Sequence, residues 1–220
     1  MGRVLFAGTN KMIISSPPDE NTVLLLHADS FNDSSANKIA LSNNGVTISD
    51  SKSKFGGKSF YFNGSSFISM TSPAFGICAG DFTIDWWQYR ENTGTLAAYN
   101  VLNTTGYSQF LIHHMDGSTV YISYAGDTWL MNVNKFTVNQ NKWEHFAIVH
   151  SGTSVYFFQN GGLVYSGVLL SNFTAGTGQV LLGCHADSTN RDYFKGYIDE
   201  FRVSNVARWT AAFTPPDKAY

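Results

Sequence analysis

The chain has 220 residues, of which 43% are hydrophobic and 14% charged, and its 14 Lys and Arg against 16 Asp and Glu give a formal charge of −2. Without a basic excess it lacks the electrostatic surface that nucleic acids require, so we expect no nucleic-acid partner. The 15% aromatic share, with so few charges, excludes a bundle of Glu- and Lys-rich helices and favours an all-β domain. No apolar run is long enough to cross a bilayer, so we expect no membrane insertion.

Residues 1–21 are expected to form an arm and linker, because Pro17 and Pro18 impose extended backbone. Residues 22–220 show no shift in composition and are expected to form one domain. Within it, many short segments rich in β-branched and aromatic residues predict strands. These are Val23–His27, Val46–Ser49, Lys58–Phe62, Phe67–Met70, Phe82–Tyr89, Thr95–Leu102, Gln109–His114, Thr119–Tyr124, Trp143–His150, Ser154–Gln159, Val164–Leu169, Gln179–Leu182 and Phe194–Val203.

Turn residues separate these strands. Asn63-Gly64, Asp116-Gly117 and Asn160-Gly161-Gly162 each lie between apolar runs and predict tight hairpins. Short strands at close spacing, with no helical period between them, predict a sandwich of two sheets. One helical turn is expected near Asn205–Trp209.

The segment Phe82–Tyr89 alternates between two kinds of side chain, as a strand covered on one face does. Phe82, Ile84 and Trp86 are expected in the core, while Thr83, Asp85, Trp87 and Tyr89 are expected on an open sheet face that meets water or ligand. Both faces of Ser154–Gln159 are apolar, so that strand is expected to be covered on both sides.

Five segments in this order carry a resemblance to a known family. They are Phe-Gly-Gly-Lys-Ser-Phe-Tyr-Phe-Asn-Gly (55–64), Gly-Asp-Phe-Thr-Ile-Asp-Trp-Trp (80–87), Lys-Trp-Glu-His-Phe-Ala-Ile-Val (142–149), Tyr-Phe-Phe-Gln-Asn-Gly (156–161) and Gly-Tyr-Ile-Asp-Glu-Phe-Arg-Val (196–203). Together they resemble the laminin-G-like, concanavalin A-like lectin/glucanase domains, over about residues 24–216. The resemblance implies an all-β jelly-roll sandwich of two antiparallel sheets, one concave and one convex.

The two ends of this stretch narrow the resemblance. Residues 23–29 and 206–216 are similar to the same parts of such domains in bacteriophage virion and tail-associated proteins. The resemblance therefore implies a place on a phage particle, or otherwise an extracellular setting.

Related domains often hold a structural calcium ion where the first strand, a Gly-Gly turn and the last strand meet. The resemblance implies Asp29, Gly57 and Asp199 as its ligands here, and two carboxylates with turn carbonyls suit the oxygen preference of calcium. The alternative is that Asp29 and Asp33 form Asx-turns while Asp199 pairs with a Lys or Arg.

A sugar-binding face needs exposed rings for stacking beside groups that hydrogen-bond to hydroxyls. The candidates, all expected on or near the concave sheet, are Asp85, Trp87, Tyr99, His113, Tyr124 and Trp129. The alternative is that the large rings, among them Trp86, Trp143 and most tyrosines, are core residues.

Glucanases of this fold carry a Glu-x-Asp-x-Glu strand whose alternate carboxylates flank the scissile bond. The sequence contains no such strand, and adjacent Asp199 and Glu200 are expected to point to opposite faces. The His residues show no zinc spacing. We therefore do not expect an enzyme. Cys78 and Cys184 are expected to be buried thiols and not a disulfide.

The sequence thus favours a non-enzymatic carbohydrate-binding adhesion module, associated with a phage virion and contacting host surface glycans. Its arm is expected to dock on other virion subunits or on copies of itself as a homo-oligomer. One alternative is a structural or decoration protein that uses the jelly roll for subunit contacts without binding sugar. A glycoside hydrolase-like protein is the other alternative.

Overall fold

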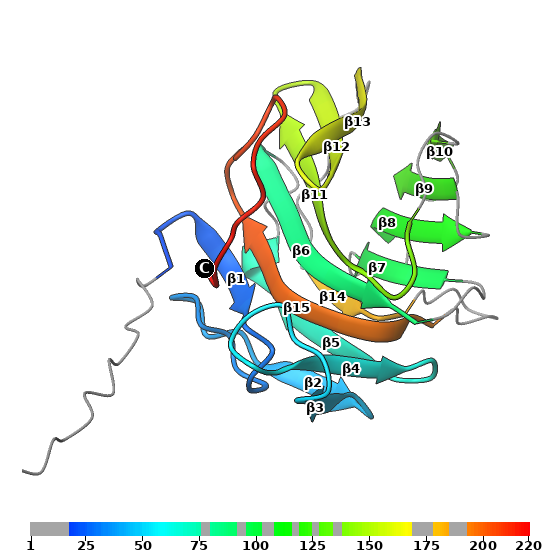
Figure 1. Ribbon diagram of the computed structural model, residues 1–220. Helices are drawn as coiled ribbons and strands as arrows, with labels where there is room; N and C mark the ends of the chain where they lie inside the picture. Colours follow the sequence, from blue (N-terminus) through cyan, green and yellow to red (C-terminus); the bar gives the residue numbers. More distant parts are fainter. Residues whose placement is uncertain are drawn as a thin grey trace, which may run out of the picture.

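Two antiparallel β-sheets packed face to face make up the domain (Figure 1). The computed structural model describes residues 18–75, 80–91, 96–102, 108–115, 119–124, 128–133, 138–168, 178–184 and 193–220. No α-helix occurs in these residues. The all-β jelly-roll sandwich expected from the sequence is confirmed.

Sheet A has eight strands, in the order β13-β12-β11-β6-β15-β4-β3, with β1 paired to β15. Their bounds are β1 (Thr22–Leu26), β3 (Thr47–Ser49), β4 (Ser59–Asn63), β6 (Phe82–Arg90), β11 (Trp143–Ser151), β12 (Ser154–Gln159), β13 (Gly162–Val168) and β15 (Lys195–Ser204). Strand β6 lies between β11 and β15, so the centre of this sheet joins distant parts of the chain.

Sheet B has seven strands, in the order β10-β9-β8-β7-β14-β5-β2. Their bounds are β2 (Leu41–Asn44), β5 (Phe67–Ser72), β7 (Leu96–Leu102), β8 (Ser108–Met115), β9 (Thr119–Tyr124), β10 (Thr128–Val133) and β14 (Gly178–Leu182). For β7 to β10 the description concerns the backbone.

All the expected strands are present, and two more were not expected. Strand β2 has a polar sequence and pairs only along β5, so it lacks the alternation that marks a half-buried strand. The prediction of a hairpin at Asn63-Gly64 is wrong, because this turn carries the chain from β4 in sheet A to β5 in sheet B. The helical turn expected near Asn205–Trp209 is also absent, and this segment has no regular secondary structure.

Side chains from the inner faces of both sheets form the hydrophobic core. Phe82, Ile84 and Trp86 are buried in it, as expected. The Trp86 ring is fully buried and its centroid lies 5.7 Å from that of Phe146 and 6.4 Å from that of Phe201, on the two neighbouring strands.

The segment 205–220, here called the C-terminal strap, crosses the outer face of sheet A; Figure 1 shows it in red beside β6 and β15. Its Trp209 and Phe213 rings stack with centroids 3.9 Å apart, and Phe213 packs edge-on against Phe158 of β12 at 5.3 Å. The expected covering of β12 on both sides is confirmed. The expectation of an open outer face at Asp85 and Trp87 is wrong, because these residues are 0% and 6% exposed beneath the covering segments.

The end of the expected linker is bound to the same strap. Asp19 forms a paired ion contact with Arg208, at 2.8 and 2.9 Å, and the Asn205 amide donates to the Asn21 carbonyl. Residues 1–17 of the expected arm lie outside the described residues.

Candidate functional site

A buried charged cluster lies under the C-terminal strap. The guanidinium of Arg202 on β15 donates to both carboxylate oxygens of Asp85 on β6, at 3.0 and 3.1 Å. The Tyr220 hydroxyl also donates to Asp85, and His145 Nε2 lies 3.4 Å from the same carboxylate. The Arg202 guanidinium stacks over the Tyr220 ring, 3.6 Å from its centroid.

Burial opposes the ionisation of Asp85, but the charge of Arg202 and the contact with His145 hold the pKa of this carboxyl below its usual range. Burial, followed by the Asp85 charge, raises the pKa of the Tyr220 hydroxyl well above 10. The cluster is therefore an ionised Asp–Arg pair capped by a neutral phenol. It fastens the strap to the sheet and does not present Asp85 to a ligand.

A β-bulge shapes the next part of this face. Asp199 pairs with Trp87, whereas Arg202 pairs with Asp85, so three residues of β15 span two of β6. Glu200, within the bulge, has a φ of 49°. The extra residue brings Asp199 and Arg202 to the same outer face, although simple alternation would separate them.

Asp199 is completely buried where this face meets the loop after β3. Its Oδ2 accepts hydrogen bonds from the Lys54 and Phe55 amides at 2.7 and 3.1 Å, while its Oδ1 has no hydrogen-bond partner among the described residues. Burial raises the pKa of Asp199 to about 7. The Lys54 ammonium lies 3.8 Å from the centroid of the Trp87 ring.

The residues expected to hold calcium are only partly brought together. Gly57 has a φ of 82° in an open turn close after Phe55, and Asp29 is exposed beyond β1. Both Asp29 and Asp199 act electrostatically on His27, whose Nδ1 binds Glu200 at 2.9 Å. No group of three or more His, Cys, Asp or Glu side chains suited to a metal occurs in the described part of the chain. The free Oδ1 of Asp199 fits a calcium ion completed mainly by carbonyls.

Asp33 makes the Asx-type contacts that the sequence offered as an alternative. Its carboxylate accepts from the Leu25, Ser35 and Ile39 amides and from the Ser35 hydroxyl, at 2.7–3.0 Å. This carboxylate ties the loop 27–40 to β1. Asp199, in contrast, binds loop amides and not the Lys or Arg side chain of the alternative.

The six residues expected to contact sugar do not lie on one sheet, so the expectation that they share a concave sheet is wrong. Asp85 and Trp87 belong to β6 of sheet A, where covering segments bury them. Tyr99, His113, Tyr124 and Trp129 belong respectively to β7, β8, β9 and β10 of sheet B. Local alternation in β6 identified an outer face but not the chain segments that cover it.

The register divides the four positions in sheet B between its faces. Tyr99 pairs with Leu182, a fully buried core residue, so Tyr99 takes a position on the inner face. The pairs from Tyr99 through Ile112 to Ile122 continue this face, and Tyr124 follows Ile122 by two residues.

The other two positions fall on the outer face of sheet B. His113 is paired with Tyr121 and Trp129 with Ser123, positions that alternate with Ile122 along β9. The structure therefore brings His113 and Trp129 to one face on nearby strands.

Sheet A carries an aromatic surface that the sequence did not reveal. Tyr61 of β4 pairs with Tyr197 of β15, Tyr197 pairs with Tyr89 of β6, and Tyr89 pairs with Trp143 of β11. These four residues, here called the aromatic row, run across four adjacent strands on the outer face. Neighbouring ring centroids are 4.8, 6.0 and 5.8 Å apart.

The alternative that places Trp143 in the core is wrong, because its ring is partly exposed and packs on Tyr89 outside the core cluster. A composition-based rule places large rings in the core. Only the inter-strand register shows that Trp143 falls in line with Tyr89, so the sequence alone held no signal for the row.

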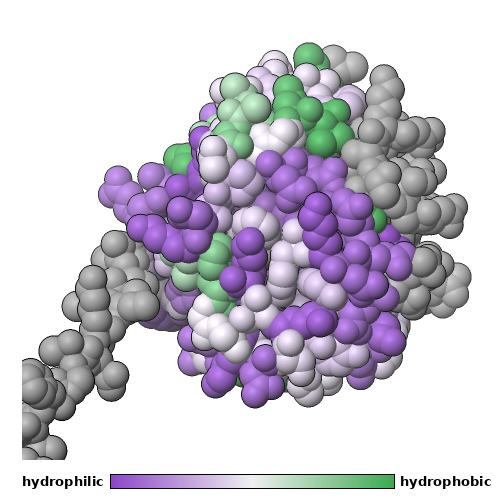
Figure 2. Space-filling view, viewed as in Figure 1, coloured by the Kyte–Doolittle hydropathy of each residue, from purple (hydrophilic) through white to green (hydrophobic). Residues whose placement is uncertain are grey.

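Hydrophobic side chains also gather on one exposed edge. Figure 2 shows green residues near the top of the molecule, where Figure 1 places β12 and β13. Leu163 and Val168, both on the edge strand β13, are 46% and 62% exposed. Cys184 is buried, as expected, and Cys78 lies outside the described residues.

Comparison with known proteins gives this architecture a family. A family model described as the concanavalin A-like lectin/glucanase superfamily matches residues 62–211, more than half of the chain. The chain belongs to this superfamily. No curated protein matches its sequence. The described residues contain no helix with the length and apolar character that crossing a bilayer requires.

Solved structures share the fold of this concanavalin A-like domain. Domain 4 of AbnA, an extracellular GH43 arabinanase from Geobacillus stearothermophilus in complex with arabinotriose, is 19% identical with a TM-score of 0.65, over 85% of this chain and 93% of that chain. The binding domain of botulinum neurotoxin DC in complex with SialylT is 14% identical with a TM-score of 0.63, over 86% and 48%. A Trypanosoma rangeli sialidase mutant is 11% identical with a TM-score of 0.66, over 88% and 32%.

The concanavalin A-like domain thus has carbohydrate-binding structural neighbours, and chains related to glycosidases are also among them. It spans about half of the toxin chain and about a third of the sialidase chain. At these identities the likeness concerns the fold.

Proposed function

We propose that this domain is a non-enzymatic carbohydrate-binding module that attaches a larger assembly to a glycan-bearing surface. The observation that carries the proposal is a concanavalin A-like sandwich in which an imidazole and an indole position, His113 and Trp129, share the outer face of sheet B. Indole rings stack on the apolar faces of sugars, and imidazole exchanges hydrogen bonds with their hydroxyls. The buried Asp85 cluster, the most conspicuous group of titratable residues described, holds the strap in place and leaves no free acid–base pair there.

Replacing Trp129 tests this proposal. We expect Trp129→Ala to weaken binding to the best ligand of a glycan array about 5- to 10-fold, because a lost aromatic contact is worth about 1 kcal/mol. The matched control is Trp87→Phe, since Trp87 is covered and its indole nitrogen has no hydrogen-bond partner in the described residues. Equal binding by wild type, Trp129→Ala and His113→Ala would contradict the assignment to sheet B, and an array without any binding would contradict the function.

Subunit contact is the second candidate function. It is favoured by the exposed Leu163 and Val168 on the edge strand β13, since edge strands with apolar side chains pair readily with other chains. A virion structural protein would bury this edge in the assembly, whereas a glycan-binding module would leave sheet B free. Protection of the β13 amides from hydrogen exchange in the assembled state distinguishes the two.

A calcium ion bound by Asp29, the Gly57 carbonyl and Asp199 forms part of the proposal. It would satisfy the unpartnered Oδ1 of Asp199 and join the loop after β1 to β15. We expect calcium to raise the melting temperature relative to a chelator, and Asp199→Asn to remove that difference. An identical melting curve with calcium and with chelator would exclude this site.

The setting that we propose is the surface of a phage particle, with copies of the chain acting together. Weak single sites gain avidity when repeated, which suits adhesion to a host surface. Labelling of purified particles by an antibody to this domain supports the setting, and unlabelled particles from a host that expresses the chain contradict it.

A further inference from the structure

The aromatic row lies on a different sheet from His113 and Trp129 and forms a separate surface. We propose that the aromatic row binds a neutral oligosaccharide laid across strands β4, β15, β6 and β11. This inference rests on the proposed function, because it adds a second contact surface for the same class of ligand.

The backbone fixes the length of the platform. Each of four neighbouring strands contributes one ring at a directly paired position, from Tyr61 to Trp143. Neighbouring strands are about 4.8 Å apart, so the row extends over about 14 Å. A row of this length exceeds one monosaccharide ring and suits a ligand with several linked rings.

Three of the four rings are placed where a ligand can reach them, while Tyr197, between Tyr61 and Tyr89, is only 7% exposed and supports its neighbours from below. Tyr61, Tyr89 and Trp143 are all partly exposed, and none belongs to the core cluster. One and two rows further along the same face, Trp87 and Asp85 are buried beneath the loop after β3 and the C-terminal strap. The aromatic row is thus the part of this central face that remains partly open among the described residues.

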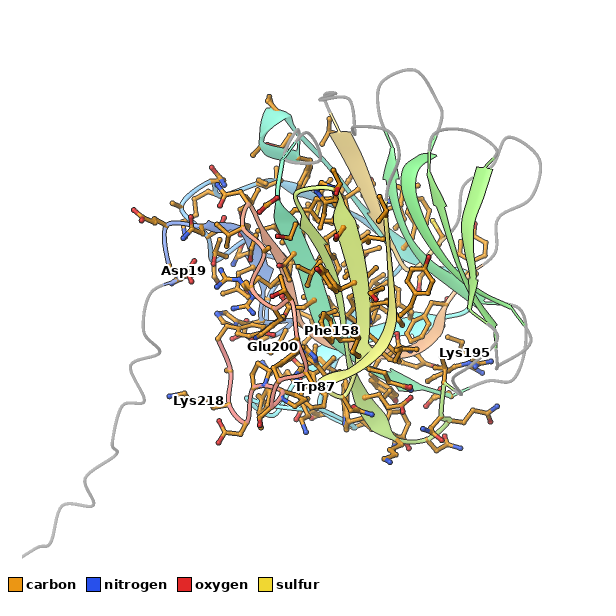
Figure 3. The ribbon with its side chains drawn as sticks, turned by 90° about the horizontal axis from the view of Figure 1, so that it is seen from above. Asp19, Trp87, Phe158, Lys195, Glu200 and Lys218 are labelled. Atoms are coloured by element: carbon orange, nitrogen blue, oxygen red, sulfur yellow. The ribbon has the colours of Figure 1, made fainter. Side chains whose placement is uncertain are left out.

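Figure 3 shows the two ends of the outer face of sheet A. Lys195, where β15 begins, lies on the opposite side of the view from Lys218 of the C-terminal strap, and Glu200 and Trp87 lie between them. Tyr197 follows Lys195 by two residues. The C-terminal strap therefore covers one end of the outer face of sheet A and leaves uncovered the other end, which carries the aromatic row.

Polar groups beside the rings suit sugar hydroxyls. The Glu91 carboxylate forms hydrogen bonds with the Tyr61 and Tyr197 side chains. The Lys52 ammonium lies 4.8 Å from the centroid of the Tyr89 ring.

The charges at the row select the class of ligand. Beside the rings, the carboxylate of Glu91 and the ammonium of Lys52 carry opposite charges that offset each other. An acidic sugar would gain from Lys52 but meet repulsion from Glu91, while the hydroxyls of a neutral sugar can donate to one and accept from the other. This balance favours an uncharged oligosaccharide.

The test uses the full chain carrying Trp129→Ala, so that the surface on sheet B is already weakened. The probe is the neutral oligosaccharide that binds wild type best on an array containing arabino-, manno- and gluco-oligosaccharides beside sialylated and uronic-acid glycans. Calorimetric titration is expected to detect residual binding in Trp129→Ala. Adding Trp143→Ala is expected to weaken that residual binding about 5- to 10-fold, while Trp143→Phe, which keeps an aromatic ring, is expected to preserve most of it.

A charge variant keeps the test valid if Trp143→Ala lowers the melting temperature. Lys52→Glu replaces the ammonium above Tyr89 by a shorter side chain of opposite charge outside the core, and we expect it to weaken the residual binding several-fold without changing the fold. If neither Trp143→Ala nor Lys52→Glu changes the residual binding, the aromatic row does not bind the oligosaccharide. Complete loss of binding in Trp129→Ala alone leads to the same conclusion. The proposed function survives either result. Binding of acidic glycans only overturns the neutral class. If wild type binds no glycan, both proposals fail.

Discussion

Replacing Arg202 by Met is expected to destabilise the domain by about 3–5 kcal/mol, because it leaves the Asp85 carboxylate buried without its main counter-charge. The carboxylate is 0% exposed and receives two hydrogen bonds from Arg202. Chemical denaturation followed by tryptophan fluorescence measures the loss.

Two variants separate the buried charge from loss of packing. The double variant Asp85→Leu/Arg202→Met removes both charges and is expected to be at least about 1 kcal/mol more stable than Arg202→Met alone. Arg208→Met is the matched control, since its partner Asp19 has a side chain that is 51% exposed, and we expect it to cost at most about 1 kcal/mol. If Arg202→Met costs no more than Arg208→Met, the cluster does not fasten the strap as described.

The second large effect is expected at Gly161, in the turn between β12 and β13. Gly161 has a φ of 76°, and a Cβ added there would lie 1.9 Å from the carbonyl oxygen of Phe213 in the C-terminal strap. Gly161→Ala therefore combines backbone strain with displacement of the strap, and we expect it to destabilise the domain by about 2–4 kcal/mol.

Gly152 provides the matched control for that substitution. It lies in the turn between β11 and β12, has a φ of 61°, and an added Cβ would meet nothing within 4 Å. Gly152→Ala carries the strain alone and is expected to cost about 1 kcal/mol. Equal losses from the two substitutions would show that the strap does not rest tightly on the hairpin.

The sequence predicted the strands of this domain well because their signals are local. Alternation along Phe82–Tyr89 correctly divided Trp86, in the core, from Trp87, on the outer side. The turn at Gly161 was likewise evident from its residue types, and the structure has a hairpin there. Each of these inferences needs only the period of a strand or the chemistry of a turn.

The candidate site was harder to predict because it depends on pairing between distant segments. Asp85 is on the expected outer face, but Tyr220, 135 residues away in sequence, covers it. Tyr99 occurs in an expected strand, yet only its register with Leu182 assigns it to the inner face. The bulge at Glu200 is equally invisible to strand periodicity. The sheet to which a strand belongs, the register of its pairing and the segments that cover it are properties of the assembled sandwich.

Among the strands that the structure describes, β1 pairs only with β15, the last of them. Four consecutive hydrophobic residues, Val23 to Leu26, therefore have no strand partner until the last strand has been made. During synthesis this apolar segment leaves the ribosome early and waits while nearly the whole domain is translated, which is the kind of exposed segment that chaperones bind. Closure of the β1–β15 pair is consequently a late event in the folding of this domain, and a nascent chain halted before residue 195 should remain open to proteases at strand β1.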